Sequence, residues 1–208
     1  MKRKIVLFDF DGVIVDSFEA AFRVSKMIYP PLSADHYRKL FEGNINDSDH
    51  AFDEAPEFRR DIDFFGEYLP MLKDQLIFPG IREAIKDIAE DHSLVIVSST
   101  TTNPIPEYLK QQDLVHCFQD ILGNDVHQKK VEKIAMVFKN FQVAASDCLF
   151  ITDTLGDLRE AAQAGVAALA VTWGFNRQEV LAYGAPKAFV EEPKDLPAAV
   201  RNHFDSLL

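Results

Sequence analysis

The chain has 208 residues, a formal net charge of −11 and a hydrophobic content of 47%. This length fits a single domain, or a core domain with a modest insertion, and the composition is that of a globular protein. The negative charge and the lack of a basic cluster argue against nucleic acid or an anionic membrane surface as the main partner.

The sequence also offers no sign of export or membrane anchoring. No apolar run approaches the ~20 residues that a membrane span needs, and no signal-peptide pattern opens the chain. Cys117 and Cys148 lack the spacing of a metal site, and a reduced cytosolic setting suits them. A cytoplasmic location is therefore expected.

The first predicted strand, residues 5–8, is an unbroken apolar run, which is typical of a strand buried on both faces of a parallel sheet. Asp9 and Asp11 follow it, at the sheet edge where open α/β folds bind ligands. Asp9 could attack a phosphate as a nucleophile, and Asp11 could shuttle protons. Two anions beside a phosphate imply a divalent cation, and oxygen ligands favour Mg²⁺. An ordinary polar turn is the alternative.

Residues 17–78 show no strong strand pattern and are interpreted as a small α-helical insertion that ends before Pro79 and Gly80. Ser17 is expected to cap a helix that reaches residue 28, and further helical stretches are predicted at 35–41, 49–55 and 56–73. The candidate specificity residues are Arg23, Lys26, Arg38, Lys39 and Asn44. The phenylalanines expected to form the insertion's own core, rather than a substrate pocket, are Phe41, Phe52, Phe58, Phe64 and Phe65.

Beyond residue 79 the predicted strands and helices alternate, which indicates a doubly wound parallel sheet. Further strands are expected at 94–97, 118–122, 149–151, 167–171 and 188–190. Helices are expected at 81–90, 104–112, 129–141, 155–164 and 196–204.

Three more groups of polar residues stand next to these elements. Ser98 and Ser99 follow the second strand, where hydroxyls and free amides can hold phosphoryl oxygens; a polar turn is the alternative. Lys129 and Lys130 open a helix, where the macrodipole disfavours cations, so one of them could neutralise Asp9 and a phosphoryl group. Two solvated surface lysines are the alternative there.

The third group is a pair of acids after the strand at 149–151. Asp153 and Asp157 are four residues apart and can face the same side of the next turn. Together with Asp9 they could supply oxygen ligands to Mg²⁺. Capping acids at a helix start would explain the pair equally well.

Taken together, these stretches resemble the four motifs of the haloacid dehalogenase-like (HAD) hydrolases. Residues 9–17 are similar to the first motif of the phosphoglycolate phosphatase and β-phosphoglucomutase branch, and residues 95–98 to the second. Lys130 best matches the third motif, although the usual following proline is missing, and Lys129 is the runner-up. Residues 152–157 resemble the fourth, with threonine in place of glycine. The motifs occur in order, each at the end of a predicted strand, and residues 171–175 resemble the loop that follows.

The resemblance implies a Rossmann-like core formed by residues 1–16 and 79–208, with strand order 3-2-1-4-5. Residues 17–78 would be the helical cap domain that opens and closes over the site. It further implies a phosphatase acting on a small phosphorylated metabolite.

The resemblance also implies roles for the site residues. Asp9 would attack the phosphate while Asp11 protonates the leaving alcohol and then activates water. The phosphoryl oxygens would be held by Ser98, Ser99 and Lys130. The ligands of Mg²⁺ would be Asp9, the main-chain carbonyl of Asp11, Asp153 and Asp157.

Two other functions fit the same motifs. A phosphomutase of the β-phosphoglucomutase type shares all four, but it would need a cap that holds a sugar phosphate in two orientations. A non-catalytic relative could bind a phosphorylated ligand or another protein. The intact acid pair weighs against pure binding, since binding alone has no need of Asp11.

Overall fold

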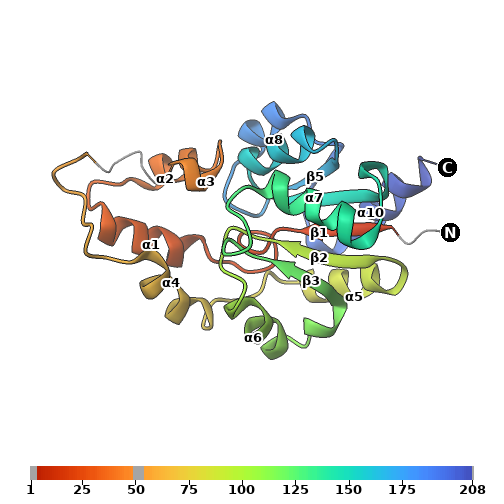
Figure 1. The fold of residues 1–208 in the computed structure, drawn as a ribbon, viewed down its shortest axis with the longest axis horizontal. Helices are drawn as coiled ribbons and strands as arrows, with labels where there is room; N and C mark the ends of the chain where they lie inside the picture. Colours follow the sequence, from red (N-terminus) through yellow and green to blue (C-terminus); the bar gives the residue numbers. More distant parts are fainter. Residues whose placement is uncertain (1–3, 49–53, 208) are drawn as a thin grey trace.

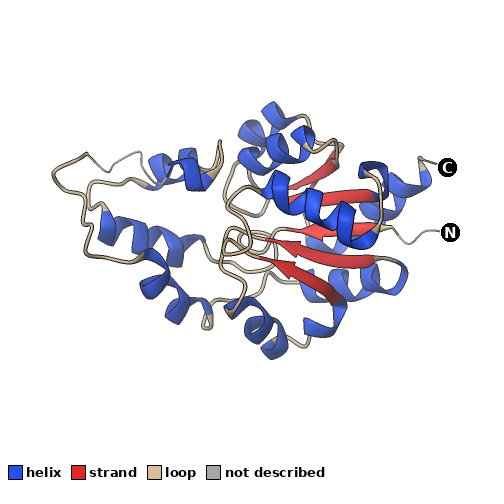
Figure 2. Cartoon of the chain, in the orientation of Figure 1, coloured by secondary structure: helices blue, strands red, loops and turns tan. Residues whose placement is uncertain are grey.

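The protein is built around a parallel sheet whose first strand lies at its centre. The structure, a computed structural model, describes residues 4–48 and 54–207. The described residues form a six-stranded sheet in the order β3-β2-β1-β4-β5-β6, with every neighbouring pair parallel (Figures 1 and 2). This confirms the predicted α/β fold and strand order, to which β6 adds an edge. The strands are β1 (Ile5–Phe8), β2 (Ser93–Val97), β3 (Phe118–Leu122), β4 (Cys148–Thr152), β5 (Ala167–Val171) and β6 (Ala188–Val190).

Helices cover both faces of the sheet, which explains why β1 is apolar at every position. Ile5 and Leu7 point to one face, where they join a core with α7 (Lys130–Phe141) and α8 (Leu155–Gln163). Val6 and Phe8 point to the other face, because side chains alternate along a strand. The helices on that second face are α5 (Ile81–Asp91), α6 (Pro104–Gln111) and α10 (Leu196–Asp205). The short helix α9 (Gln178–Leu181) packs beside α8.

Between β1 and α5 the described residues form helices and no strand of the sheet. In Figure 1 they gather beyond the arrowheads of the strands, and we call residues 17–78 the helical insertion. Its two connections to the core run side by side, since Val15 pairs with Ile77 in an antiparallel bridge. The helices are α1 (Phe18–Ile28), α2 (Ala34–Leu40), α3 (Ile45–Ser48) and α4 (Phe64–Leu72).

Two helix predictions within the insertion need correction. The helix predicted over 56–73 forms only from Phe64, because the Asp63 carboxylate accepts a hydrogen bond from the Gly66 N–H at 3.0 Å and caps the helix there. Ser17 precedes α1 but makes no side-chain cap, since its hydroxyl binds Asp11 instead. Most of the helix predicted at 49–55 lies outside the described residues, and residues 54 and 55 are not helical.

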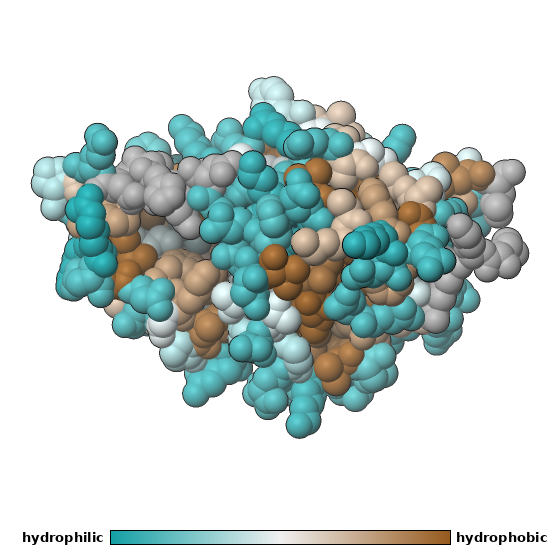
Figure 3. Space-filling view, in the orientation of Figure 1, coloured by the Kyte–Doolittle hydropathy of each residue, from teal (hydrophilic) through white to brown (hydrophobic). Residues whose placement is uncertain are grey.

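The surface mixes hydrophilic and hydrophobic residues. Hydrophilic residues cover much of the face drawn in Figure 3. Hydrophobic residues reach that face over the helical insertion, at the left of the view, and also over the core, at its centre and right. No helix among the described residues is long and apolar enough to cross a membrane.

Candidate active site

The parallel ladder places the predicted site residues at one edge of the sheet. Its hydrogen bonds continue one residue past the strands, as the Asp9 N–H donates to the Ile151 carbonyl at 2.9 Å and the Ser98 N–H to the Leu122 carbonyl at 3.0 Å. Asp153 follows β4, the other neighbour of β1. The backbone N–H groups of Asp9 and Ser98 are therefore held by the sheet itself.

Lys130 lies buried between two carboxylates. Its Nζ is 2.7 Å from Asp9 Oδ2 and 2.6 Å from Asp157 Oδ2, and only 2% of the residue is exposed. Its backbone N–H donates to the Glu160 carboxylate at 3.1 Å, which fixes the first turn of α7. Lys129, the alternative considered from the sequence, is exposed at the N-cap. Lys130 is thus the lysine that the fold brings to Asp9.

The buried cluster holds more negative charge than Lys130 can balance. Burial raises the pKa of Asp9 well above its usual value; Lys130 opposes this, while Asp157 and Asp153 add to it. Burial likewise raises the pKa of Asp153 to about 7. Burial works against the charge on Lys130, but Asp157 and Asp9 outweigh it and raise the pKa of Lys130. When all are ionised, three acids and one ammonium leave a net charge of −2, which one divalent cation would balance.

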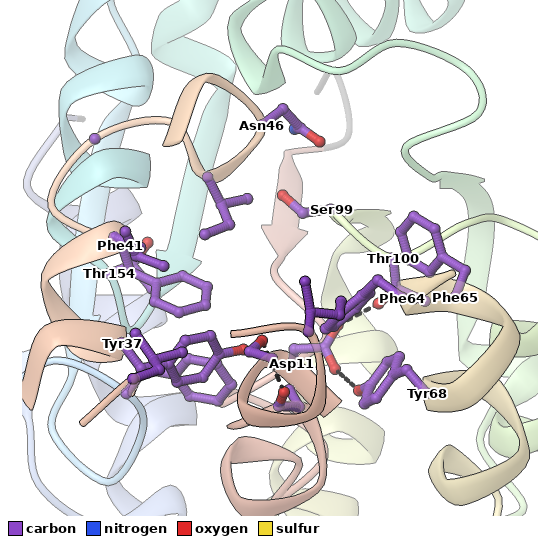
Figure 4. A pocket seen from close by; sticks show the side chains of 18 of the residues that line it. Asp11, Tyr37, Phe41, Asn46, Phe64, Phe65, Tyr68, Ser99, Thr100 and Thr154 are labelled. Carbon is purple, nitrogen blue, oxygen red and sulfur yellow. Dashed lines mark hydrogen bonds between the residues drawn. The ribbon is translucent and has the colours of Figure 1, made fainter. Parts of the chain in front are cut away.

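The side chain of Asp11 is held by three hydroxyl groups. Ser17 Oγ donates to Asp11 Oδ1 at 2.8 Å, Thr100 Oγ1 donates to Oδ2 at 2.8 Å, and the Tyr68 hydroxyl from α4 also donates to Oδ1 (Figure 4). Sequence reasoning missed all three donors. The position of Ser17 inside the first motif was a usable signal, whereas nothing in the sequence marks Tyr68.

The loop after β2 is supported by a second buried lysine. Ser98 is fully buried, and its Oγ accepts the Thr100 N–H at 2.9 Å, while Ser99 lies at the cavity. The Ser98 main-chain oxygen accepts a hydrogen bond from Lys133 Nζ at 2.6 Å. Burial lowers the pKa of Lys133 to about 8, with Lys130 adding to the effect. Lys133 was not predicted, although it lies one turn from Lys130 on the same helix face.

Asp153 has an unused oxygen that suits a cation. Its Oδ2 accepts the Phe175 N–H at 2.6 Å, but its Oδ1 is buried without a hydrogen-bond partner among the described residues. The carboxylate packs so closely on the loop after β1 that a Cβ at Gly12 would lie 2.0 Å from Oδ2, and Gly12 also has a φ of 75°.

No group of three or more His, Cys, Asp or Glu in the described chain is arranged to hold a metal ion by itself. Asp157, predicted as a ligand, accepts hydrogen bonds from Lys130 and Thr152 on its Oδ2. A partial set made of Asp9, Asp153 and a main-chain carbonyl fits Mg²⁺, which usually keeps several waters and shares its shell with phosphate. The charge surplus and the unpartnered Asp153 oxygen both fit such an ion.

A cavity of about 380 Å³ joins the acids to the helical insertion. Asp9, Asp11 and Lys130 lie at its core end, and Figure 4 shows Tyr37 and Phe41 on one side with Phe64, Phe65 and Tyr68 on the other. The insertion's phenylalanines were predicted to form its own core rather than a pocket. Phe41, Phe64 and Phe65 do pack against the hydrophobic core, but together with Phe58 they also line this cavity. Phe52 lies outside the described residues.

The five polar residues predicted to face a substrate are absent from the described cavity lining. The Arg38 guanidinium lies 4.0 Å from the centre of the Phe18 ring, where it makes a cation–π contact. Asn44 Nδ2 donates to Glu160 Oε1 of α8 at 3.1 Å. These two side chains are thus engaged in packing and in contacts with the core.

Hydrogen bonds to main-chain carbonyls hold the insertion against the core. The Gly156 N–H donates to the Phe41 carbonyl at 2.9 Å, and Asn46 Nδ2 donates to the Gln128 carbonyl at 2.8 Å. A Cβ at Gly156 would lie 2.0 Å from the Gly43 oxygen, so only glycine allows this approach. The insertion therefore covers the acids in this structure.

Comparison with known proteins places these features in a family. Several relatives are named phosphoglycolate phosphatase. That of Vibrio parahaemolyticus is 25% identical over 93% of this chain and 94% of its own length. That of Synechococcus elongatus is 27% identical over 94% of this chain and 96% of its own.

Solved structures share the fold. A haloacid dehalogenase-like hydrolase from Streptococcus pneumoniae has a TM-score of 0.77 at 21% identity, over 96% of this chain and 99% of its own. CbbY from Rhodobacter sphaeroides, solved with phosphate, has a TM-score of 0.76 at 16% identity, over 93% and 96%. The model of the haloacid dehalogenase-like hydrolases matches residues 6–171. The resemblance drawn from the motifs is confirmed: this chain belongs to the haloacid dehalogenase-like hydrolase family.

Proposed function

We propose that this chain is a magnesium-dependent phosphatase that hydrolyses a small-molecule phosphate monoester through an aspartyl-phosphate on Asp9. The main support for the proposal is that Asp9 and Asp11 line the same cavity but have different hydrogen-bonding and charged neighbours. Asp9 is paired with the Lys130 ammonium, whereas Asp11 is held by hydroxyls. Two carboxylates in unlike environments can divide the work of nucleophile and acid–base. The names of the phosphoglycolate phosphatase relatives support the same reaction class.

In the first step a carboxylate oxygen of Asp9 forms a bond to phosphorus as the ester P–O bond breaks. The Asp11 carboxyl gives its proton to the leaving alcohol oxygen. The Lys130 ammonium, 2.7 Å from Asp9 Oδ2, offsets the negative charge of the phosphoryl group. The loop formed by Ser98 and Ser99 holds the phosphoryl oxygens through its hydroxyls and amides.

In the second step Asp11, now a carboxylate, takes a proton from a water molecule that attacks phosphorus. The bond to Asp9 breaks, and inorganic phosphate leaves. The three hydroxyls around Asp11 keep its carboxyl oriented through both transfers. Mg²⁺ would be held by Asp9, Asp153 and the Asp11 main-chain carbonyl with Asp157 in support, and it would supply further charge neutralisation at the phosphoryl group.

The helical insertion would act as a cap domain that swings about its connections near residues 16–17 and 78–79. The hydrogen bonds from Gly156 to Phe41 and from Asn46 to Gln128, which join the insertion to the core, would belong to its closed position. Superposable insertions in structures with and without a phosphate analogue would count against this motion. The cytoplasmic location expected from the sequence stays a prediction.

The test is release of inorganic phosphate from phenyl phosphate and other small monoesters in the presence of Mg²⁺. EDTA and the Asp9→Asn substitution should each abolish it. Asp91→Asn, at an exposed position at the end of α5, is the matched control and should keep full activity. Unchanged activity in Asp9→Asn would overturn the proposal. A phosphomutase would instead interconvert sugar phosphate isomers and release little phosphate.

A further inference from the structure

The lining of the cavity at the proposed active site indicates the chemistry of the substrate's ester group. With the phosphate at Asp9, the ester group would extend into the part of the cavity that the helical insertion forms. That part is walled mainly by apolar side chains. They come from α1, the segment after α2, the segment before α4 and α4 itself: Ile28, Phe41, Phe58, Ile62, Phe64 and Phe65.

The charges of the lining exclude a second anionic group on the substrate. Lys130 is the only lysine or arginine in the described lining, and its ammonium already pairs with Asp9 and Asp157. Asp11 and Asp63 add further acids to the same cavity. A carboxylate or a second phosphate on the ester group would be desolvated here without a cation, which is costly.

The polar groups of the insertion wall are largely engaged with the protein itself. Ser25 Oγ donates to the Ala21 carbonyl at 3.0 Å, and Asn46 Nδ2 donates to the Gln128 carbonyl and to the Asn44 side chain. A sugar that carries many hydroxyls would have to displace such bonds. An apolar group would instead cover exposed aromatic surface, which is favourable by about 25 cal/mol per Å².

We infer that the ester group of the substrate is an uncharged apolar alcohol or phenol, of alkyl or aryl chemistry, that packs between Phe41 on one wall and Phe64 and Phe65 on the other (Figure 4). This inference rests on the proposed function, since it takes the phosphate to lie at Asp9. It departs from the phosphoglycolate named for the relatives, whose carboxylate has no cation partner in the described lining.

Binding of non-hydrolysable phosphonates tests the inference without turnover. Phenylphosphonate and hexylphosphonate are compared with phosphonoacetate, which carries a carboxylate, by titration calorimetry on the magnesium-loaded protein. The two apolar ligands should bind about tenfold tighter or more, as expected for burial of one apolar side group. Equal or tighter binding of phosphonoacetate would overturn the inference.

A matched pair of charge variants sharpens the test. Ile62→Lys places a cation in the wall and should tighten phosphonoacetate binding about tenfold while weakening phenylphosphonate. Leu76→Lys adds the same charge at a position that is 77% exposed and outside the described lining, and it should change neither ligand. Should Ile62→Lys fail to fold, Phe65→Ala serves instead, with a several-fold loss for phenylphosphonate only. A uniform loss for all three ligands would contradict the inference.

Turnover separates this inference from the function on which it rests. Faster hydrolysis of phosphoglycolate than of phenyl or hexyl phosphate would leave the phosphatase intact and overturn the apolar ester group. Preferential binding of the apolar phosphonates without hydrolysis of any ester would overturn the phosphatase and retain the ligand class.

Discussion

Replacing Lys133 by methionine should stabilise the protein at neutral pH and much less at alkaline pH. The side chain of Lys133 is fully buried, and its Nζ donates to the Ser98 carbonyl at 2.6 Å. Burial, reinforced by the neighbouring Lys130, lowers the pKa of Lys133 from 10.5 to about 8. Keeping this lysine charged in the fold therefore costs free energy.

The magnitude and its sign follow from that pKa difference. At about 1.4 kcal/mol per pH unit, the charged Lys133 costs about 3 kcal/mol at pH 7. Between pH 8 and 10.5 the folded chain binds fewer protons than the unfolded chain, so the free energy of unfolding rises with pH. Below pH 8 the cost is fully present, and above 10.5 it is gone. Loss of the hydrogen bond to Ser98 offsets about 1 kcal/mol, so Lys133→Met should gain about 2 kcal/mol at pH 7.

Urea unfolding at pH 7, 8.5 and 9.5 measures this effect. The free energy of unfolding of Lys133→Met should exceed that of the wild type at pH 7, and this difference should shrink by about 2 kcal/mol by pH 9.5. Lys139→Met, which removes an exposed lysine from the last turn of the same helix, controls for the loss of a charge from α7. Lys133→Met should also release phosphate more slowly than the wild type, because the Ser98 loop loses the hydrogen bond from Lys133. A stability difference that does not change with pH would refute the reasoning.

Three further substitutions test the site. Tyr68→Phe keeps the ring packing but removes one hydrogen-bond donor to Asp11, so kcat should fall about tenfold. The control is Tyr108→Phe, because the Tyr108 hydroxyl binds a main-chain carbonyl away from Asp11. Equal kcat values in the two variants would contradict the role of Tyr68. Gly156→Ala sets a Cβ 2.0 Å from the Gly43 oxygen and should lower kcat/KM about tenfold or more without lowering the thermal midpoint. Asp153→Asn should raise the Mg²⁺ concentration for half-maximal activity at least tenfold, and should raise the thermal midpoint in EDTA because a buried charge is lost. An unchanged Mg²⁺ titration would exclude Asp153 as a ligand.

The core was predictable because its signals are local. Two apolar runs, β1 and β4, are each followed directly by an acid, Asp9 and Asp153. Each run indicates a buried strand, and the acid after it marks the carboxyl edge of the sheet. Parallel pairing then brings these ends together without any knowledge of side-chain contacts. The macrodipole argument pointed to a cation at the start of the helix but left Lys129 and Lys130 open, and only the family resemblance favoured Lys130.

The helical insertion was not predictable in the same way, because its roles depend on long-range contacts. Tyr68 reaches Asp11 across 57 residues of chain, and neither its neighbours nor its spacing distinguishes it from a core tyrosine. Phe64 and Phe65 are adjacent apolar residues at the start of a short helix, so the sequence allowed either a core or a cavity wall. In the fold they do both, and only the packing of the insertion over the acids shows this.

Direct detection of phosphate on Asp9 tests the central claim. The magnesium-loaded Asp11→Asn variant is mixed with phenyl phosphate, whose leaving group needs little protonation, and quenched in acid before peptide mass analysis. The mechanism predicts a phosphoryl group on the peptide that contains Asp9, accumulating because the water step is slow, and none in the Asp9→Asn variant. Wild-type phosphate release with no phosphorylated Asp9 in either the wild type or Asp11→Asn would contradict it.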